Sequence, residues 1–232
     1  MKRRALLAGA LLALPLTAQA QALQCRLPPQ IEAPALPQPD GPRRALPIRG
    51  YTLALSWSPE FCRGHQRDGR STLQCGGQMG RFGFILHGLW PESEPGRWPQ
   101  WCSDKPVAAE TLRRNLCMTP SPYLLTHEWA KHGSCMARSP EGYFKAGAAL
   151  FGSLRFPDMQ ALSRRPALTA GDLRAALRRS TPFLPAAAIR VTANARGWLQ
   201  EVHVCYGRDF LPTPCADRGA RDDEPLKIER GT

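Results

Sequence analysis

Eight cysteines spread along the chain constrain its fold more than any other feature of the sequence. They are Cys25, Cys62, Cys75, Cys102, Cys117, Cys135, Cys205 and Cys215. An even number of cysteines in an exported protein is expected to form disulfides, here four. A zinc site is the alternative, but no C-x-x-C pair occurs and the spacings are long and irregular. Spacing alone indicates only two local loops, Cys62 with Cys75 and Cys205 with Cys215.

Residues 1–20 predict a secretory signal peptide. Three basic residues precede an apolar stretch from Ala5 to Leu16, and Ala18-Gln19-Ala20 suits signal peptidase. The alternative, a transmembrane anchor, needs roughly 20 apolar residues, and this run is shorter. We therefore expect a periplasmic or secreted protein without a membrane segment. Without residues 1–20 the formal net charge falls from +12 to +9, which favours polyanionic partners but also serves solubility or adhesion to acidic polymers.

The remaining 212 residues divide into an arm and one domain. Residues 21–50 form a proline-rich N-terminal arm, because seven prolines lie between positions 26 and 48 and no helix or strand period is present. Cys25 is placed to tie this arm to the domain, residues 51–232. A proline-rich ligand for another protein is the alternative, but no repeated motif supports it.

Mixed strands and helices without regular alternation predict an α+β fold, with a central antiparallel sheet, packed helices and disulfides. Strands are expected at residues 51–57 and 82–87 and in a hairpin of residues 189–193 and 198–205. Helices are expected at residues 121–132, 139–150 and 169–179. Gly133 is the expected cap of the first helix. The arginines of the last helix, Arg174, Arg178 and Arg179, either contact phosphates or, as we prefer, form a solvated face.

Three of the five histidines lie in two short segments whose composition points to acid–base chemistry. His87 ends the apolar run at residues 82–87, and His127 and His132 belong to the helix at 121–132. Taking His127 as zero, Lys131, Glu128 and His132 fall at about 40°, 100° and 140° around that helix, so all four polar groups share one face. Histidine exchanges protons near neutral pH, so these groups suit catalysis on an anion.

RNA cleavage fits these residue types because RNA carries its own nucleophile, the ribose 2′-hydroxyl. The enzyme needs only a base, an acid and cations for the phosphoryl oxygens. His87 and His132 can be the acid and the base, in an order that the residues alone do not fix. Lys131 supplies positive charge, and Glu128, four residues before His132, orients the site.

Other readings of the same residues remain open. H-E-x-x-x-H resembles the zinc-binding H-E-x-x-H helix, but the extra residue moves the second histidine to about 140° around the helix. Cys135 close to His132 suggests a nucleophile, although a disulfide is favoured. His65 and His203 are taken as surface or structural histidines. Trp90 either stacks on a base or packs in the core, and Glu92 either bonds a base edge or is a solvated acid.

These segments resemble the ribonuclease T2 family, a group of secreted endoribonucleases. Its two signature blocks are similar to residues 84–91, Phe-Ile-Leu-His-Gly-Leu-Trp-Pro, and residues 127–135, His-Glu-Trp-Ala-Lys-His-Gly-Ser-Cys. Residues 51–57, followed by Phe61 and Cys62, are similar to the family's opening strand and first disulfide loop. The resemblance covers most of residues 51–215 and is strongest in the two blocks.

The resemblance implies an α+β fold and metal-independent transphosphorylation through a 2′,3′-cyclic phosphate. It implies His132 as general base and His87 as general acid, with three further residues on the phosphate: His127, Glu128 and Lys131. Trp90 and Glu92 match base-binding positions, and Glu92 stands where an aspartate is frequent. The resemblance also implies the disulfides Cys62–Cys75, Cys102–Cys135 and Cys205–Cys215, and so leaves Cys25 for Cys117.

We therefore expect an endoribonuclease that cleaves single-stranded RNA with low sequence specificity, acting as a monomer without cofactor or metal. Unpaired bases can splay onto an aromatic ring, which favours single strands. The alternatives are a non-catalytic protein that binds RNA or another polyanion and, less favoured, a zinc hydrolase.

Overall fold

A computed structural model describes residues 25–231, and the expected signal peptide lies outside them. Its strands are β1 (Gly50–Trp57), β2 (Phe84–Glu92), β3 (Ile189–Ala193) and β4 (Leu199–Gly207). Its α-helices are α1 (Ser58–His65), α2 (Thr72–Cys75), α3 (Ala109–Asn115), α4 (Pro122–Lys131), α5 (Pro140–Ser153), α6 (Met159–Ser163) and α7 (Ala170–Ser180). Short 3₁₀ turns cover Gly69–Ser71, Gly133–Cys135 and Ala186–Ala188. The α+β class expected from the sequence is confirmed.

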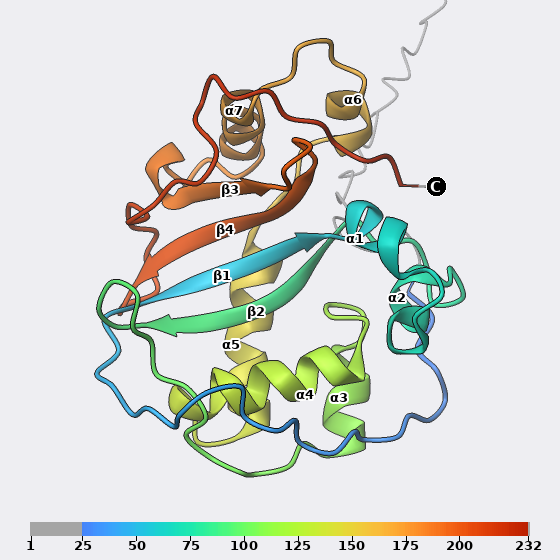
Figure 1. Cartoon of the computed structure of the whole chain (residues 1–232), viewed down its shortest axis with the longest axis vertical. Coiled ribbons are helices and arrows are strands. Elements are labelled where there is room, and N and C mark those ends of the chain that lie inside the picture. Colours follow the sequence, from blue (N-terminus) through green and yellow to red (C-terminus); the bar gives the residue numbers. More distant parts are fainter. Residues whose placement is uncertain (1–24, 232) are drawn as a thin grey trace, which may run out of the picture.

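The four strands form one antiparallel sheet in the order β2-β1-β4-β3 (Figure 1). The expected hairpin is confirmed as β3 and β4, and its turn closes through the Gly197 amide, which donates to the Asn194 carbonyl at 2.8 Å. Gly197 has φ +78°, a conformation that glycine adopts without steric cost.

Alternation of side chains gives the sheet one apolar and one polar face. Leu53, Leu55 and Trp57 of β1 are buried on the first face, as the sequence pattern predicts. Helix α5 crosses behind this face in Figure 1, and its Gly147 leaves room for the Leu86 side chain. The other face carries Ser56 in register with Glu201 of β4. Helix α4 lies beside β2, the edge strand (Figure 1), so polar residues of both can meet.

All four disulfides that the family resemblance implies are formed. They are Cys25–Cys117, Cys62–Cys75, Cys102–Cys135 and Cys205–Cys215. Cys135 is therefore a disulfide partner and not a free nucleophile. A cross-link of this kind limits the unfolded chain most when it closes a long loop, and Cys25–Cys117 spans 92 residues.

The N-terminal arm, residues 25–49, follows the expected extended course. It contains no helix or strand apart from an isolated bridge between Arg44 and Gln100. It runs past α3 and α4 (Figure 1), where Arg113 of α3 donates to the Pro28 carbonyl at 2.7 Å. Leu36 and other apolar side chains of the arm pack against the core. The arm is thus part of the folded body over the residues described.

Two local expectations about element ends are wrong. The strand expected to stop at His87 continues to Glu92. Gly133 is not a left-handed helix cap, because α4 ends at Lys131 and a 3₁₀ turn follows. A Cβ on Gly133 would lie 2.5 Å from the Tyr143 ring, so the close approach of α5 requires glycine here.

Arg174 also differs from expectation. It neither faces solvent nor is free for phosphate, since it is only 2% exposed. Its guanidinium donates to the backbone carbonyls of Ile189, Arg218 and Ala220 and pairs with Asp222. The buried cation therefore fastens the C-terminal segment to α7 and β3.

Replacing Arg174 by methionine should destabilise the protein. Arg174→Met removes the donor of these bonds and leaves buried carbonyls unpaired, at a cost of about 3–5 kcal/mol. The free energy of unfolding in urea, with disulfides intact, measures the effect. Arg178→Met on the exposed side of α7 is the matched control and should change it by no more than about 0.5 kcal/mol. Equal effects of the two substitutions would contradict the structural role of Arg174.

Candidate active site

A β-bulge in β2 brings His87 into the site. Ala54 of β1 pairs with Gly88 and Leu55 pairs with Leu86, so His87 is an extra residue without a partner on β1. A bulge redirects the side chain at the extra position. Because of it, Leu86 stays on the apolar face while His87 and Trp90, three residues apart, both reach the polar face. The sequence places His87 at a strand tip, whereas the structure holds it within a strand.

The outer edge of β2 is secured by hydrogen bonds from segments that are not strands. The Leu86 amide donates to the Met118 carbonyl at 3.0 Å, and the Thr119 hydroxyl donates to the Leu86 carbonyl at 2.6 Å. The Leu89 amide donates to the buried Tyr143 hydroxyl at 3.1 Å. These bonds satisfy the unpaired backbone groups of an edge strand on both sides of His87.

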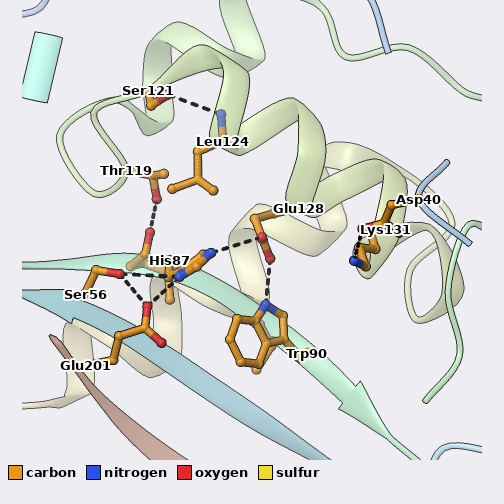
Figure 2. A network of polar contacts seen from close by, with 12 residues as sticks. Asp40, Ser56, His87, Trp90, Thr119, Ser121, Leu124, Glu128, Lys131 and Glu201 are labelled. Atoms are coloured by element: carbon orange, nitrogen blue, oxygen red, sulfur yellow. Dashed lines mark hydrogen bonds and ion pairs between the residues drawn. The ribbon is translucent and has the colours of Figure 1, made fainter. Parts of the chain in front are cut away.

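Glu128 of α4 is a buried carboxylate that faces β2 (Figure 2). It is 3% exposed and accepts a hydrogen bond from Trp90 Nε1 at 2.7 Å, while its other oxygen lies 3.4 Å from His87 Nε2. Gly88 makes this approach possible, because a Cβ there would lie 2.0 Å from Glu128 Oε2. The glycine of the H-G-L-W segment is therefore needed for space.

The other nitrogen of His87 contacts a second carboxylate. His87 Nδ1 lies 2.6 Å from Glu201 Oε1 of β4, which also accepts a hydrogen bond from the Ser56 hydroxyl at 2.6 Å (Figure 2). The second oxygen of Glu201 lies 2.7 Å from His203 Nε2. Sequence reasoning missed Glu201 and Ser56 and placed His203 outside the site. Period-two alternation puts Glu201 and His203 on one strand face, but the pairing register with β1 is not readable from the sequence.

His132 follows the last residue of α4 and is 9% exposed. Its ring lies 5.6 Å from the Trp90 ring, centre to centre, and the His87 ring lies 5.3 Å from the same indole. The two histidines therefore gather around one tryptophan. Trp90 packs among polar groups and does not belong to the hydrophobic core.

The two histidines have opposite proton affinities. Burial opposes the charge of His87, but hydrogen bonds and negative charges from Glu128 and Glu201 outweigh it and raise the pKa of His87 to about 10. Burial is also the largest influence on His132; aided by the charges of Lys131 and the other histidines, it prevails over Glu128 and lowers the pKa of His132 to about 4. Near neutral pH His87 is an imidazolium and His132 a neutral imidazole.

The two carboxylates stay ionised despite their burial. Burial favours the neutral acid in both, but the hydrogen bond and charge of His87 hold the pKa of Glu128 below its usual range. Hydrogen bonds from His203, His87 and Ser56 likewise hold the pKa of Glu201 well below its usual range. His87 thus lies between two anions, which explains its retained proton.

Lys131 and His127 lie apart from this centre, on the side of α4 that meets the N-terminal arm. Lys131 Nζ is 2.5 Å from Asp40 of the arm (Figure 2). It also lies 5.9 Å from the centre of the Trp101 ring. His127 meets Trp101 edge to face at 5.7 Å. The structure therefore joins His87, Glu128 and His132 but holds Lys131 against a carboxylate that sequence reasoning did not foresee.

One pocket lies beside His87 and a second lies beside Trp90. One of about 770 Å³ is lined by Ser56, His87 and Glu201 together with basic residues, which are Arg63, Arg70 and Arg196. The other, about 720 Å³, is lined by Trp90, Glu92 and His203. The site is thus open on two sides, and both base-binding candidates from the sequence line the same pocket.

His65 is an exposed residue, as expected, with Nδ1 2.7 Å from the Phe61 carbonyl oxygen. Within residues 25–231, no group of three or more His, Cys, Asp or Glu side chains is arranged to hold a metal ion. In the same range, no helix has the length and apolar character to cross a bilayer.

The sequence is similar to those of known ribonucleases. A sequence model of the ribonuclease T2 family matches residues 49–215. A probable ribonuclease of Haemophilus influenzae is 33% identical over 190 residues, which are 77% of this chain and 65% of that protein. A ribonuclease of Aeromonas hydrophila is 30% identical over 185 residues, 75% of this chain and 80% of that protein. This chain thus spans slightly less than two thirds of the Haemophilus relative.

Solved structures share the fold. Trichomaglin, described as an S-like ribonuclease, superposes with a TM-score of 0.62 at 20% identity, covering 78% of this chain and 98% of that one. A ribonuclease-related protein from Calystegia sepium gives a TM-score of 0.60 at 19% identity, covering 79% and 98%. With a family match across most of the domain and the same fold in these structures, the chain belongs to the ribonuclease T2 family.

Proposed function

We propose that this protein is an endoribonuclease that cleaves single-stranded RNA by transphosphorylation, with His132 as general base and His87 as general acid. The observation that carries the proposal is the opposed protonation of these two histidines around one tryptophan and one buried carboxylate. Environments that separate two pKa values in this way assign the acid and the base.

The reaction needs no nucleophile from the protein. His132 takes the proton of the 2′-hydroxyl, and the 2′-oxygen forms a bond to phosphorus. The bond from phosphorus to the 5′-oxygen breaks, and that oxygen takes the proton held by His87. The products are a 2′,3′-cyclic phosphate and a free 5′-hydroxyl. In a following hydrolysis the two histidines exchange roles, and water opens the ring to a 3′-phosphate.

Charges around the reacting phosphate come from both histidine segments. The imidazolium of His87 provides one positive charge, and Glu128 orients it from the buried side at 3.4 Å. Lys131 and His127 act at longer range. In the free protein Lys131 pairs with Asp40, and His127 packs against Trp101. Electrostatic stabilisation of the phosphoryl oxygens by fixed groups of this kind is a large contribution to rate.

The two pockets suit the nucleotides on either side of the phosphate. Trp90 and Glu92 line one, where an aromatic ring can stack on a base, and three arginines line the other. Low sequence specificity is part of the same proposal. In our proposal the mature protein is a monomer of residues 21–232, exported to the periplasm or the medium, with a ribonuclease domain at 51–232.

Substituting either histidine should abolish most of the activity. His87→Ala or His132→Ala removes one proton transfer, so cleavage should fall by about 10²- to 10⁴-fold. Purified protein is incubated with RNA in excess chelator, and mass spectrometry identifies the product ends. Lys145→Ala, at an exposed position of α5 that lines neither pocket, is the control and should retain activity. RNA binding without cleavage by the folded wild type would favour the non-catalytic alternative, and recovery of lost activity by zinc would favour a zinc hydrolase.

The pH profile should be bell-shaped with a wide plateau. The base must be unprotonated, so kcat/KM should fall as the pH drops through about 4, the pKa of His132. The acid must be protonated, so kcat/KM should fall as the pH rises through about 10, the pKa of His87. Initial rates on a dinucleotide, corrected for uncatalysed hydrolysis, measure both limbs. A single limb near neutral pH would contradict the assignment.

Gly88→Ala should lower activity while the protein stays folded. The added methyl group overlaps Glu128 Oε2 and lies 2.6 Å from Trp90 Nε1, so it displaces the carboxylate from His87. We expect a loss of about 100-fold, comparable to misplacing a catalytic group. Gly152→Ala in α5, where a Cβ meets nothing within 4 Å, is the matched control. Unchanged activity of Gly88→Ala would show that the position of Glu128 is not needed.

A further inference from the structure

We infer that Glu201 is a positioning residue for the proposed reaction: it fixes the ring of His87 so that Nε2, and not Nδ1, exchanges protons with the substrate. This inference rests on the proposed function and assigns a role to a residue outside both histidine segments. The contacts of the Glu201 side chain on β4 support it.

Glu201 is bonded on both oxygens. Oε1 lies 2.6 Å from His87 Nδ1 and accepts from the Ser56 hydroxyl at the same distance. Oε2 lies 2.7 Å from His203 Nε2. Ser56 stands directly across from Glu201 in the ladder between β1 and β4, so the backbone register places the hydroxyl. A carboxylate held at three points on rigid strands cannot turn away from His87.

His203 supports the carboxylate from the far side. Its ring meets Trp90 edge to face at 5.3 Å and is 7% exposed. Trp90 in turn donates to Glu128, which faces His87 Nε2. His87 is thus surrounded by a closed set of contacts from β1, β4 and α4, and each ring nitrogen has its own carboxylate.

The two carboxylates lie at different distances from the ring nitrogens of His87, and this difference decides which ring proton can pass to the substrate. Glu201 is at 2.6 Å from Nδ1, whereas Glu128 is at 3.4 Å from Nε2. The Nδ1 proton is therefore retained in the short bond, and the Nε2 proton is the one that can be transferred. The neutral ring that remains keeps its proton on Nδ1, so Nε2 is free to accept a proton from water in the hydrolysis step.

Several charged groups face His87, and the test must separate Glu201 from them. Glu128 of α4 contacts the ring, His132 lies across Trp90 from it, and His203 accompanies Glu201 on β4. His127 and Lys131 lie farther away, where α4 meets the arm. Glu201→Gln keeps the size of the side chain and removes only its charge. Glu60→Gln is the matched control, because Glu60 lines the same pocket and pairs with Arg63 instead of His87.

The first measurement does not need enzymatic activity. Nitrogen-15 resonances of the histidine rings, assigned with a His87→Gln sample, report protonation and tautomer. In Glu201→Gln the pKa of His87 should fall by about 1–3 units, the usual effect of losing an adjacent opposite charge. Glu60→Gln should leave it unchanged. His203→Gln, which removes one support of Glu201, should give a smaller decrease.

The second measurement is the alkaline limb of kcat/KM. It should move to lower pH in Glu201→Gln by the same amount as the NMR value, with a kcat about tenfold lower or more on the plateau. A merely structural role would lower the rate without moving the limb. Thermal denaturation establishes that the variants are folded, and Ser56→Ala provides a second, milder perturbation of the same carboxylate, with a smaller shift expected.

The outcomes separate the two hypotheses. If the His87 resonance and the limb are unchanged in Glu201→Gln while the wild type cleaves RNA, the inference on Glu201 is wrong and the proposed function stands. If the resonance shifts as expected but the wild type never cleaves RNA, Glu201 positions His87 and the proposed function is wrong.

Discussion

The site depends on the ion pairs of one histidine with two carboxylates, one buried and one partly buried. Glu128 is removed from water and Glu201 is partly so, and a buried anion is costly unless it is paired and hydrogen-bonded. His87 provides the shared countercharge, at 2.6 Å from one carboxylate and 3.4 Å from the other. Removing its proton would leave two anions facing a neutral ring, which is why the imidazolium persists to high pH. His132 lacks this pairing, and burial together with nearby positive charges keeps it neutral.

Much of the surrounding structure serves to let these groups approach. The bulge in β2 turns His87 toward α4, Gly88 makes room for the Glu128 carboxylate, and Gly133 lets Tyr143 reach the backbone of β2. The bulge and the two glycines determine where the backbone lies, and the side chains of His87 and Glu128 carry the chemistry. Sites built on strands and helices in this manner hold geometry better than loops do.

The sequence predicts the parts of this protein that follow local rules. Alternation marks β1, the Thr169 and Asp172 capping box marks α7, and the turn before Gly197 marks the hairpin. The α+β class follows from these elements, and the disulfide pairing from the family resemblance. His87, Glu128 and His132 are recognisable because they lie within two short segments of fixed spacing.

What the sequence does not reveal is set by register and tertiary contact. The bulge cannot be predicted from the sequence, because Leu86-His87-Gly88 is equally compatible with the end of a strand. Glu201 is 114 residues from His87 and meets it only through the order of strands in the sheet. Arg174 looks like a surface charge on a helical pattern, and only the return of the C-terminal segment buries it. Asp40 reads as an ordinary polar residue between prolines.

The course of the arm has a practical consequence for anyone who shortens this protein. The family match begins at residue 49, so a chain trimmed to that boundary loses both Cys25 and Asp40. Cys117 would then carry an unpaired thiol, open to mispairing with the six other cysteines during oxidative refolding. Lys131 would lose its counterion at the same time. Measurements on such a fragment would describe a molecule with a different charge near Lys131 and without the Cys25–Cys117 disulfide of the full chain.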